Sequence, residues 1–150
     1  MPSSSGCSAA RNSLPRYAAD RVLLAPVEDV WSFVAEPYHL SDWWPGISGV
    51  EPDRRGLAAG ARWKVQGPSY VRKPETPGVL LVRAVEPLRR FGFELLREHV
   101  VAELALRPLD ARRTEAALTV EFPWWNIFRG TLPKQALGRL YDLVQTAAEL

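Results

Sequence analysis

Apolar residues follow a helical period in two stretches of this chain. The first is Ala25–Ile47, where apolar positions three and four residues apart form one stripe: Val27, Val30, Trp31 and Val34. Pro26 precedes the stripe, at a helix position where its missing N–H loses no hydrogen bond, and two acidic residues follow in the first turn. We therefore predict a helix that begins at Pro26, and after Pro37 a second short helix that ends in a Trp-Trp-Pro-Gly sequence.

The second helical stretch is Thr131–Leu150. Its apolar stripe consists of Leu137, Leu140, Tyr141, Val144 and Ala148, and polar residues occupy the opposite side. This pattern predicts one long amphipathic helix that must bury a single face.

Seven other segments are predicted to be extended, most of them with alternating apolar and polar residues. They are Arg16–Leu24, Ser48–Asp53, Ala61–Gln66, Val79–Glu86, Arg90–Leu96, Val100–Arg107 and Thr114–Phe122. The short connections in the second half predict an antiparallel meander with one apolar and one solvated face. Two loops interrupt the pattern: Gly67–Gly78, which has three prolines, and Pro123–Gly130, which contains Trp124 and Trp125.

Length, charge and cysteine content narrow the class of protein. The 150 residues predict one domain over 15–150, after a disordered tail at 1–14 that is rich in Ser, Ala and Gly. A formal charge of +2 with scattered arginines disfavours nucleic-acid binding, which needs a clustered basic face. The single cysteine, Cys7, allows no intrachain disulfide. No segment reads as a signal peptide or membrane span, so we expect a cytoplasmic protein that is monomeric or weakly dimeric.

The order of these elements is similar to that of a known superfamily. The residues that carry the likeness are Ala25–Trp31 (APVEDVW) and Trp43–Gly46 (WWPG), between the first strand and the meander. Over Pro15–Leu150 the chain resembles the START-like superfamily, also called SRPBCC or Bet v 1-like, and within it the bacterial polyketide cyclase/dehydrase and lipid-transport group. The resemblance implies an α+β helix-grip fold: a curved antiparallel sheet of about seven strands wraps a long C-terminal helix, with two short helices after the first strand. It also implies an internal cavity for an apolar or aromatic small molecule.

The apolar faces of the predicted elements supply the lining of that cavity. The expected ligand-binding residues are Trp31, Trp43, Trp44, Trp63, Arg83, Phe91, Phe93, Leu104, Leu118, Tyr141 and Val144. Trp31 is expected inside, and Trp43 and Trp44 at the entrance, which they control together with Gly67–Gly78. In the alternative interpretation one of these two tryptophans belongs to the core and the other is a surface anchor. These residues predict binding or carriage of a lipid- or polyketide-like molecule, oriented by Arg83 or Tyr141.

The orientation of Arg83 stays open, because its strand is apolar on both faces. If it points inward, it needs an ionic partner or a ligand anion or carbonyl. As a polyketide cyclase or dehydratase, the protein would use the same cavity with Arg83, Tyr141, Tyr70 or His99 as an acid–base group. A third hypothesis is a protein-interaction module that uses an aromatic rim at Trp124 and Trp125.

Motifs for bound metals and cofactors are missing from the sequence. The two histidines, His39 and His99, are too far apart along the chain to give the matched spacing of a metal site. No glycine-rich phosphate loop or G-x-S-x-G elbow occurs. We therefore expect neither a metal nor a cofactor.

Overall fold

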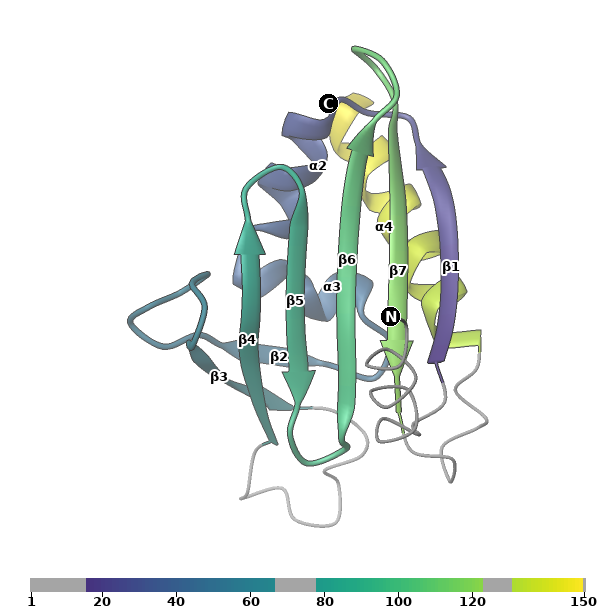
Figure 1. Ribbon diagram of the computed structural model, residues 1–150. Helices are drawn as coiled ribbons and strands as arrows, with labels where there is room; N and C mark the ends of the chain where they lie inside the picture. The colour runs from purple at the N-terminus through teal and green to yellow at the C-terminus, as the bar shows by residue number, and fades with distance from the viewer. Residues whose placement is uncertain (1–15, 67–77, 123–130, 150) are drawn as a thin grey trace, which may run out of the picture.

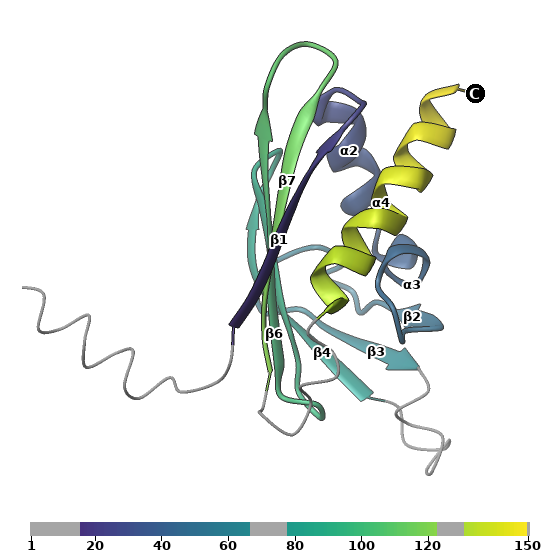
Figure 2. The same ribbon diagram turned by 90° about the vertical axis from the view of Figure 1, so that its right-hand side faces the viewer.

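The computed structural model describes residues 16–66, 78–122 and 131–149, which form one sheet with helices on one face (Figures 1 and 2). The strands are β1 (Arg16–Leu23), β2 (Gly49–Glu51), β3 (Arg62–Gln66), β4 (Gly78–Glu86), β5 (Arg90–Leu95), β6 (Val100–Pro108) and β7 (Thr114–Glu121). They are hydrogen-bonded in the order β1-β7-β6-β5-β4-β3-β2, and all neighbours are antiparallel. The predicted antiparallel sheet is therefore confirmed.

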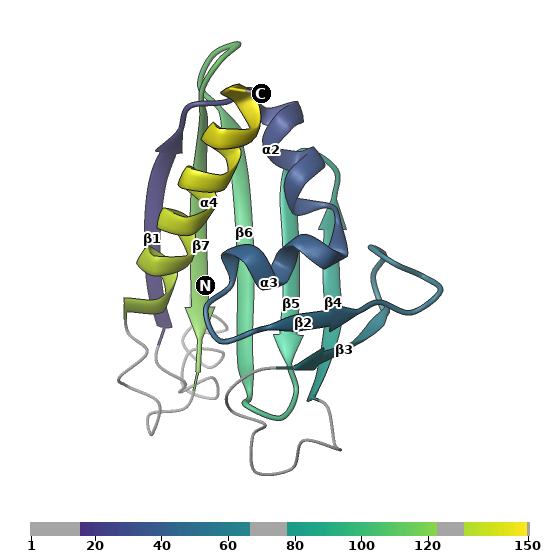
Figure 3. The ribbon, with the colours of Figure 1, turned by 180° about the vertical axis from the view of Figure 1, so that it is seen from behind.

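The helices cover the concave face of this sheet. They are α2 (Val27–Val34), the 3-10 helix η1 (Pro37–His39), α3 (Leu40–Trp43) and α4 (Leu132–Glu149). Helix α4 runs along β1 and β7, whereas α2 and α3 lie over the middle of the sheet (Figure 3). Strands β2 and β3 bend toward the helices below α3 (Figure 2). The result is the α+β helix-grip arrangement that the resemblance implies.

Several predicted features lie outside the described residues. They are the tail at 1–14 with Cys7, the loop Gly67–Gly78 except its last residue, and the loop Pro123–Gly130. Tyr70, Trp124 and Trp125 fall in these loops and remain sequence predictions.

Alternation along the central strands separates a buried face from a solvated one. Across β6 and β7, Leu104 pairs with Leu118 on the concave face, and both side chains are buried. One residue earlier in β6, Glu103 pairs with Thr119 on the outer face. Because strand side chains point alternately to the two faces, this one register places every second residue in the core.

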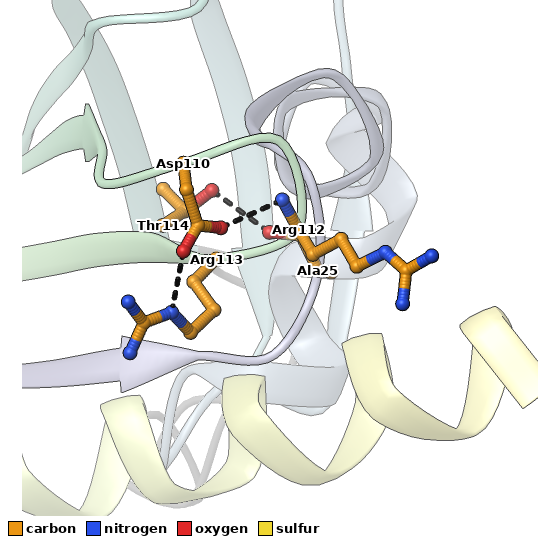
Figure 4. Close-up of polar contacts among 5 residues, drawn as sticks. All are labelled: Ala25, Asp110, Arg112, Arg113 and Thr114. Atoms are coloured by element: carbon orange, nitrogen blue, oxygen red, sulfur yellow. Dashed lines mark hydrogen bonds and ion pairs between the residues drawn. The ribbon is translucent and has the colours of Figure 1, made fainter.

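The turn from β1 into α2 is held by a buried threonine. Thr114, at the start of β7, donates its hydroxyl to the carbonyl of Ala25 at 2.9 Å (Figure 4). The next carbonyl, that of Pro26, accepts the backbone N–H of Asp29 at 3.0 Å and of Val30 at 3.1 Å, which starts the helix. Helix α2 therefore begins where its sequence predicts, and a long-range contact fixes its entry.

Strand β4 contains an irregularity that the alternation does not reveal. Val82 pairs with Phe93 of β5, but Ala84 pairs with Gly92, so Arg83 is an extra residue without an opposite partner. It lies on the outer face, where its guanidinium binds the carboxylate of Glu94 at 2.9 Å. Its side chain is 52% exposed. The expectation that Arg83 lines the interior is therefore wrong, because the bulge shifts the phase of the strand around it.

Candidate ligand-binding interior

A chain of five aromatic rings crosses the concave face from α3 to β3. Consecutive ring centroids are 5.9 Å apart for Trp43 and Trp44, 5.0 Å for Trp44 and Phe93, 5.2 Å for Phe93 and Phe91, and 6.1 Å for Phe91 and Trp63. The first two contacts are edge-to-face, a favoured geometry for aromatic pairs. Sequence reasoning selected all five residues, and the structure brings them together as one aromatic wall.

Both members of the Trp43–Trp44 pair are core residues. Their exposed fractions are 0% and 1%, so neither indole forms a rim and neither is a surface anchor. Trp43 is the last residue of α3, and Trp44 has an extended backbone, with φ −93° and ψ 116°. This change of backbone conformation lets two adjacent side chains both pack inside. The expectation that the pair stands at an entrance is corrected accordingly.

The indole N–H groups of the wall differ in their partners. Trp63 donates its Nε1–H to the carbonyl of Gly56 at 2.8 Å. The Nε1 of Trp43 is buried and has no acceptor among the described residues. Buried polar groups are nearly always hydrogen-bonded, so an unpaired donor in this interior needs an explanation. Trp43 therefore supplies a polar group that a molecule with an acceptor oxygen could satisfy.

The other apolar residues selected from the sequence also face this interior. Leu104, Leu118 and Val144 are buried, while Trp31 is partly buried and packs against the core. They come from β6, β7, α4 and α2 respectively. The predicted apolar lining thus lies on the inner surfaces of four elements, together with the aromatic wall.

Tyr141 is half-buried on α4 and carries an arginine on its ring. The guanidinium carbon of Arg21 lies 4.1 Å from the ring centroid, a cation–π contact between β1 and α4. Arg21 shares its strand face with Tyr17, Ala19 and Leu23, which is the signal in the sequence for an inward arginine. The guanidinium has no ion pair among the described side chains.

The remaining polar candidates lie elsewhere. His99 is exposed in the turn between β5 and β6, with φ 59°. His39 stacks on Phe33, with centroids 4.1 Å apart, and its Nδ1 is 2.8 Å from the carbonyl oxygen of that residue. Among the described candidates for acid–base work, Tyr141 is thus the one placed on the inner side of α4.

Sequence reasoning missed two polar groups. One is the unpaired indole of Trp43, and the other is Glu98 in the β5–β6 turn, whose two carboxylate oxygens are shielded from solvent without a hydrogen-bond donor among the described residues. Nothing in the local sequence marks either group, because shielding depends on segments distant along the chain.

Two carboxyl groups in the described part of the chain have a lowered pKa, and both build turns outside the interior. Asp53 accepts backbone N–H groups, of which that of Arg62 at 2.9 Å lowers its pKa most. The pKa of Asp110 is lowered chiefly by the backbone N–H of Arg112 at 2.8 Å, and then by the side chain of Arg113. Hydrogen bonds to the charged form favour it, which is the cause in both cases.

Within the described ranges, no group of three or more His, Cys, Asp or Glu side chains could hold a metal ion. None of the described helices is long and apolar enough to cross a membrane.

Comparison with known proteins identifies the family. The model of the polyketide cyclase/dehydrase and lipid transport family matches residues 16–146. The chain belongs to this family. The resemblance stated from Ala25–Trp31 and Trp43–Gly46 is thereby confirmed. No curated protein matches the sequence.

Solved structures share the fold at low sequence identity. A protein from Nitrosospira multiformis has a TM-score of 0.69 and 18% identity, over 91% of this chain and 100% of that one. A protein from Nitrosomonas europaea has a TM-score of 0.68 and 18% identity, over 90% and 97%. The di-domain ARO/CYC protein BexL of the BE-7585A biosynthetic pathway has a TM-score of 0.68 and 16% identity, and covers 88% of this chain and 47% of its own. These matches and the family together support a ligand-binding helix-grip fold.

Proposed function

We propose that this protein binds or carries an apolar or aromatic small molecule, lipid- or polyketide-like, between the concave face of the sheet and α4. The observation that carries the proposal is the aromatic wall with one donor, the Nε1–H of Trp43, that has no acceptor among the described residues. An apolar pocket with few polar groups is the usual composition of a small-molecule site. Membership in the family supports the same class of ligand.

The Nε1–H of Trp43, which has no acceptor among the described residues, restricts the chemistry of the ligand. A hydrocarbon would leave the indole N–H unpaired, and the desolvation cost of that group would remain. A carbonyl or other acceptor oxygen within an apolar body would pair with it and leave the rings in contact with the rest of the molecule. We therefore propose a ligand that combines an aromatic or acyl body with at least one acceptor oxygen.

Two tryptophan variants test the role of this donor. Native mass spectrometry of freshly purified protein should show a retained ligand, and titration with fluorescent apolar probes should show saturable binding. Trp43→Phe should weaken binding of a carbonyl-bearing probe about fivefold, because a neutral hydrogen bond contributes on the order of 1 kcal/mol. Trp63→Phe is the matched control for the loss of ring size within the aromatic wall: its N–H already bonds the carbonyl of Gly56, so this variant should weaken binding of carbonyl-bearing and hydrocarbon probes alike, whereas Trp43→Phe should discriminate between them.

The outcomes separate cleanly. A native mass equal to that of the protein alone, together with no binding of the fluorescent probes, would contradict the proposed function. Binding that is equally strong in Trp43→Phe would leave the proposed ligand binding standing and remove Trp43 from ligand recognition.

A second candidate is a cyclase or dehydratase that uses the same interior. It is favoured by the position of Tyr141 on the inner side of α4, with the guanidinium carbon of Arg21 4.1 Å from its ring centroid, because a hydroxyl and a cation there give the interior two polar groups for acid–base and electrostatic work. Tyr141→Phe should then abolish turnover of a polyketide-like substrate while the protein stays folded by circular dichroism. Arg83→Ala is the control, because that residue lies on the outer face. Turnover that survives in Tyr141→Phe would exclude this role.

A further inference from the structure

Exposed apolar side chains gather at one end of the sheet. Of the five large ones that are exposed in the described part of the chain, all but Tyr38 lie where β1, β4 and β6 end: Val22, Leu24, Leu88 and Leu109. The three leucines belong to three separate turns, and Val22 lies near the end of β1; the β6–β7 turn projects furthest (Figure 1, upper end). Single exposed apolar residues are ordinary, but a group of them on neighbouring turns indicates a contact surface. We call these four residues, together with Arg89, Arg107, Arg112 and Arg113, the turn end.

Two open hollows lie between these turns. One, of about 550 Å³, is lined by Leu24 and residues 110–113 of the β6–β7 turn. The other, of about 540 Å³, lies at the step where β6 extends past the β4–β5 turn; its lining consists of Val27, Glu86, Leu88, Arg89, Arg90, Ala105, Leu106, Arg107 and Pro108. Apolar and cationic side chains therefore alternate around the same end of the molecule.

Two of the arginines at the turn end are uncompensated. Arg107 is paired with Glu115, and Arg113 with Asp110. Arg89 and Arg112 have no acidic partner among the described residues. The side chain of Arg112 extends away from the carboxylate that its backbone N–H contacts (Figure 4).

The β6–β7 turn holds its shape without a partner. The carboxylate of Asp110 accepts the N–H of Arg112 and the side chain of Arg113, both at 2.8 Å. The backbone N–H of Leu109 also donates to the carbonyl of Arg113 at 2.9 Å. A turn fixed in this way presents Leu109 and the guanidinium of Arg112 without a cost of ordering its backbone on binding.

We propose that the turn end docks on the surface of an anionic lipid bilayer, with its leucines at the acyl boundary and Arg89 and Arg112 on headgroup phosphates. Separate projecting leucines flanked by arginines fit an interface that is apolar below and anionic above. A protein partner would instead be met by a continuous, densely packed apolar centre. The proposal rests on surface residues and stands independently of what occupies the interior.

Vesicle co-sedimentation tests the proposal on the full chain. Wild-type protein should bind vesicles of phosphatidylcholine mixed with phosphatidylglycerol, and bind pure phosphatidylcholine much less. Arg89→Gln with Arg112→Gln should weaken binding to the anionic vesicles by roughly 25-fold, since each arginine near such a surface contributes roughly fivefold. Leu88→Asp with Leu109→Asp should weaken it by roughly tenfold or more. Leu88 has φ 68°, a backbone region that Asp tolerates, so this variant adds no strain.

Matched controls come from elsewhere on the surface. Tyr38→Asp changes the one exposed large apolar residue of the described ranges that lies outside the turn end, and Arg54→Gln changes an exposed arginine of the β2–β3 connection. Both should bind vesicles as wild type does. Equal losses in the control and turn-end variants, or wild-type protein that binds neither vesicle, would overturn the proposal. So would capture of an acidic protein through Arg89 and Arg112 without any vesicle binding.

Vesicle binding does not depend on the interior. Trp43→Phe should keep full vesicle binding, so that a failure of the membrane proposal and a failure of the proposed ligand site give different results.

Discussion

The two faces of the sheet are built from different interactions. On the concave face, packed rings and aliphatic chains exclude water, as at Phe91 and Phe93. On the outer face, charged residues pair across or near neighbouring strands: Arg16 with Glu121, Arg83 with Glu94, Arg90 with Glu86 and Glu103, and Arg107 with Glu115. Both faces come from the same strands and the same hydrogen-bond ladder, so the difference lies in the side chains alone.

The two faces therefore contribute differently to the stability of the fold. Full burial of one large apolar side chain contributes about 1.5–3 kcal/mol, whereas an exposed ion pair contributes about 0–1 kcal/mol. The concave face therefore holds the fold together and sets the register of the strands, whereas the outer face keeps the sheet hydrated and adds small cross-strand contributions. Variants on the two faces should differ accordingly.

The largest loss should follow truncation within the aromatic wall. Phe93→Ala removes a fully buried ring that contacts both Trp44 and Phe91, and should lower the free energy of unfolding by about 3–5 kcal/mol in urea denaturation. Leu81→Ala, on the outer face of β4, is the control and should cost less than half as much. Equal losses would show that the two faces contribute alike.

The next largest effect should come from the buried hydroxyl of Thr114. Thr114→Val keeps the shape but leaves the carbonyl of Ala25 without its donor, at a cost of about 1–3 kcal/mol (Figure 4). Thr119→Val, on the outer face of the same strand, should change stability by less than about 0.5 kcal/mol. Urea midpoints of the two variants measure the contrast directly. Similar midpoints would argue against a stabilising role for the hydrogen bond between Thr114 and Ala25.

Low pH should remove a smaller contribution, that of Asp53 to the stability of the folded protein. Its pKa lies below the ordinary value of 3.8 in the folded protein, mainly because of the backbone N–H of Arg62. The folded carboxyl thus binds a proton less readily than the unfolded one. Its stabilisation is present in full above the unfolded pKa and is lost as the pH falls through the folded pKa.

The measurement is the difference in urea midpoint between wild type and Asp53→Asn. This difference should stay constant from about pH 7 to about pH 5 and shrink as the pH falls below the unfolded value of 3.8. Thr119→Val, which changes no titratable group, should show no such trend. A constant difference for Asp53→Asn would contradict the assignment.

The smallest effect should come from the outer ion pairs. Arg83→Ala breaks the contact with Glu94 and should cost at most about 1 kcal/mol, with a smaller cost at high salt. Binding of apolar probes should be unchanged, because Arg83 lies outside the interior. A loss of probe binding would return Arg83 to the ligand site.

Much of the candidate site could be predicted from the sequence. Trp63, Phe91 and Leu104 lie on regular strands, where period-two alternation gives the direction of each side chain. Trp43 and Trp44 are expected at an entrance from the sequence but are buried, because adjacent tryptophans at the end of a helix carry no signal of their burial. The missing acceptor at Trp43 depends on everything around it and has no local signature.

The sequence by itself determined the seven strands, the helix from Pro26, the long final helix and the family, because periodicity, helix starts and turn residues act over a few positions. Only the tertiary structure decided the side on which Arg83 lies, since a bulge arises from pairing between two strands. It also placed Arg21 over Tyr141 and gathered the exposed leucines of three turns at one end. Contacts between residues distant in the chain made these choices, and a local pattern of apolar and polar residues does not encode them.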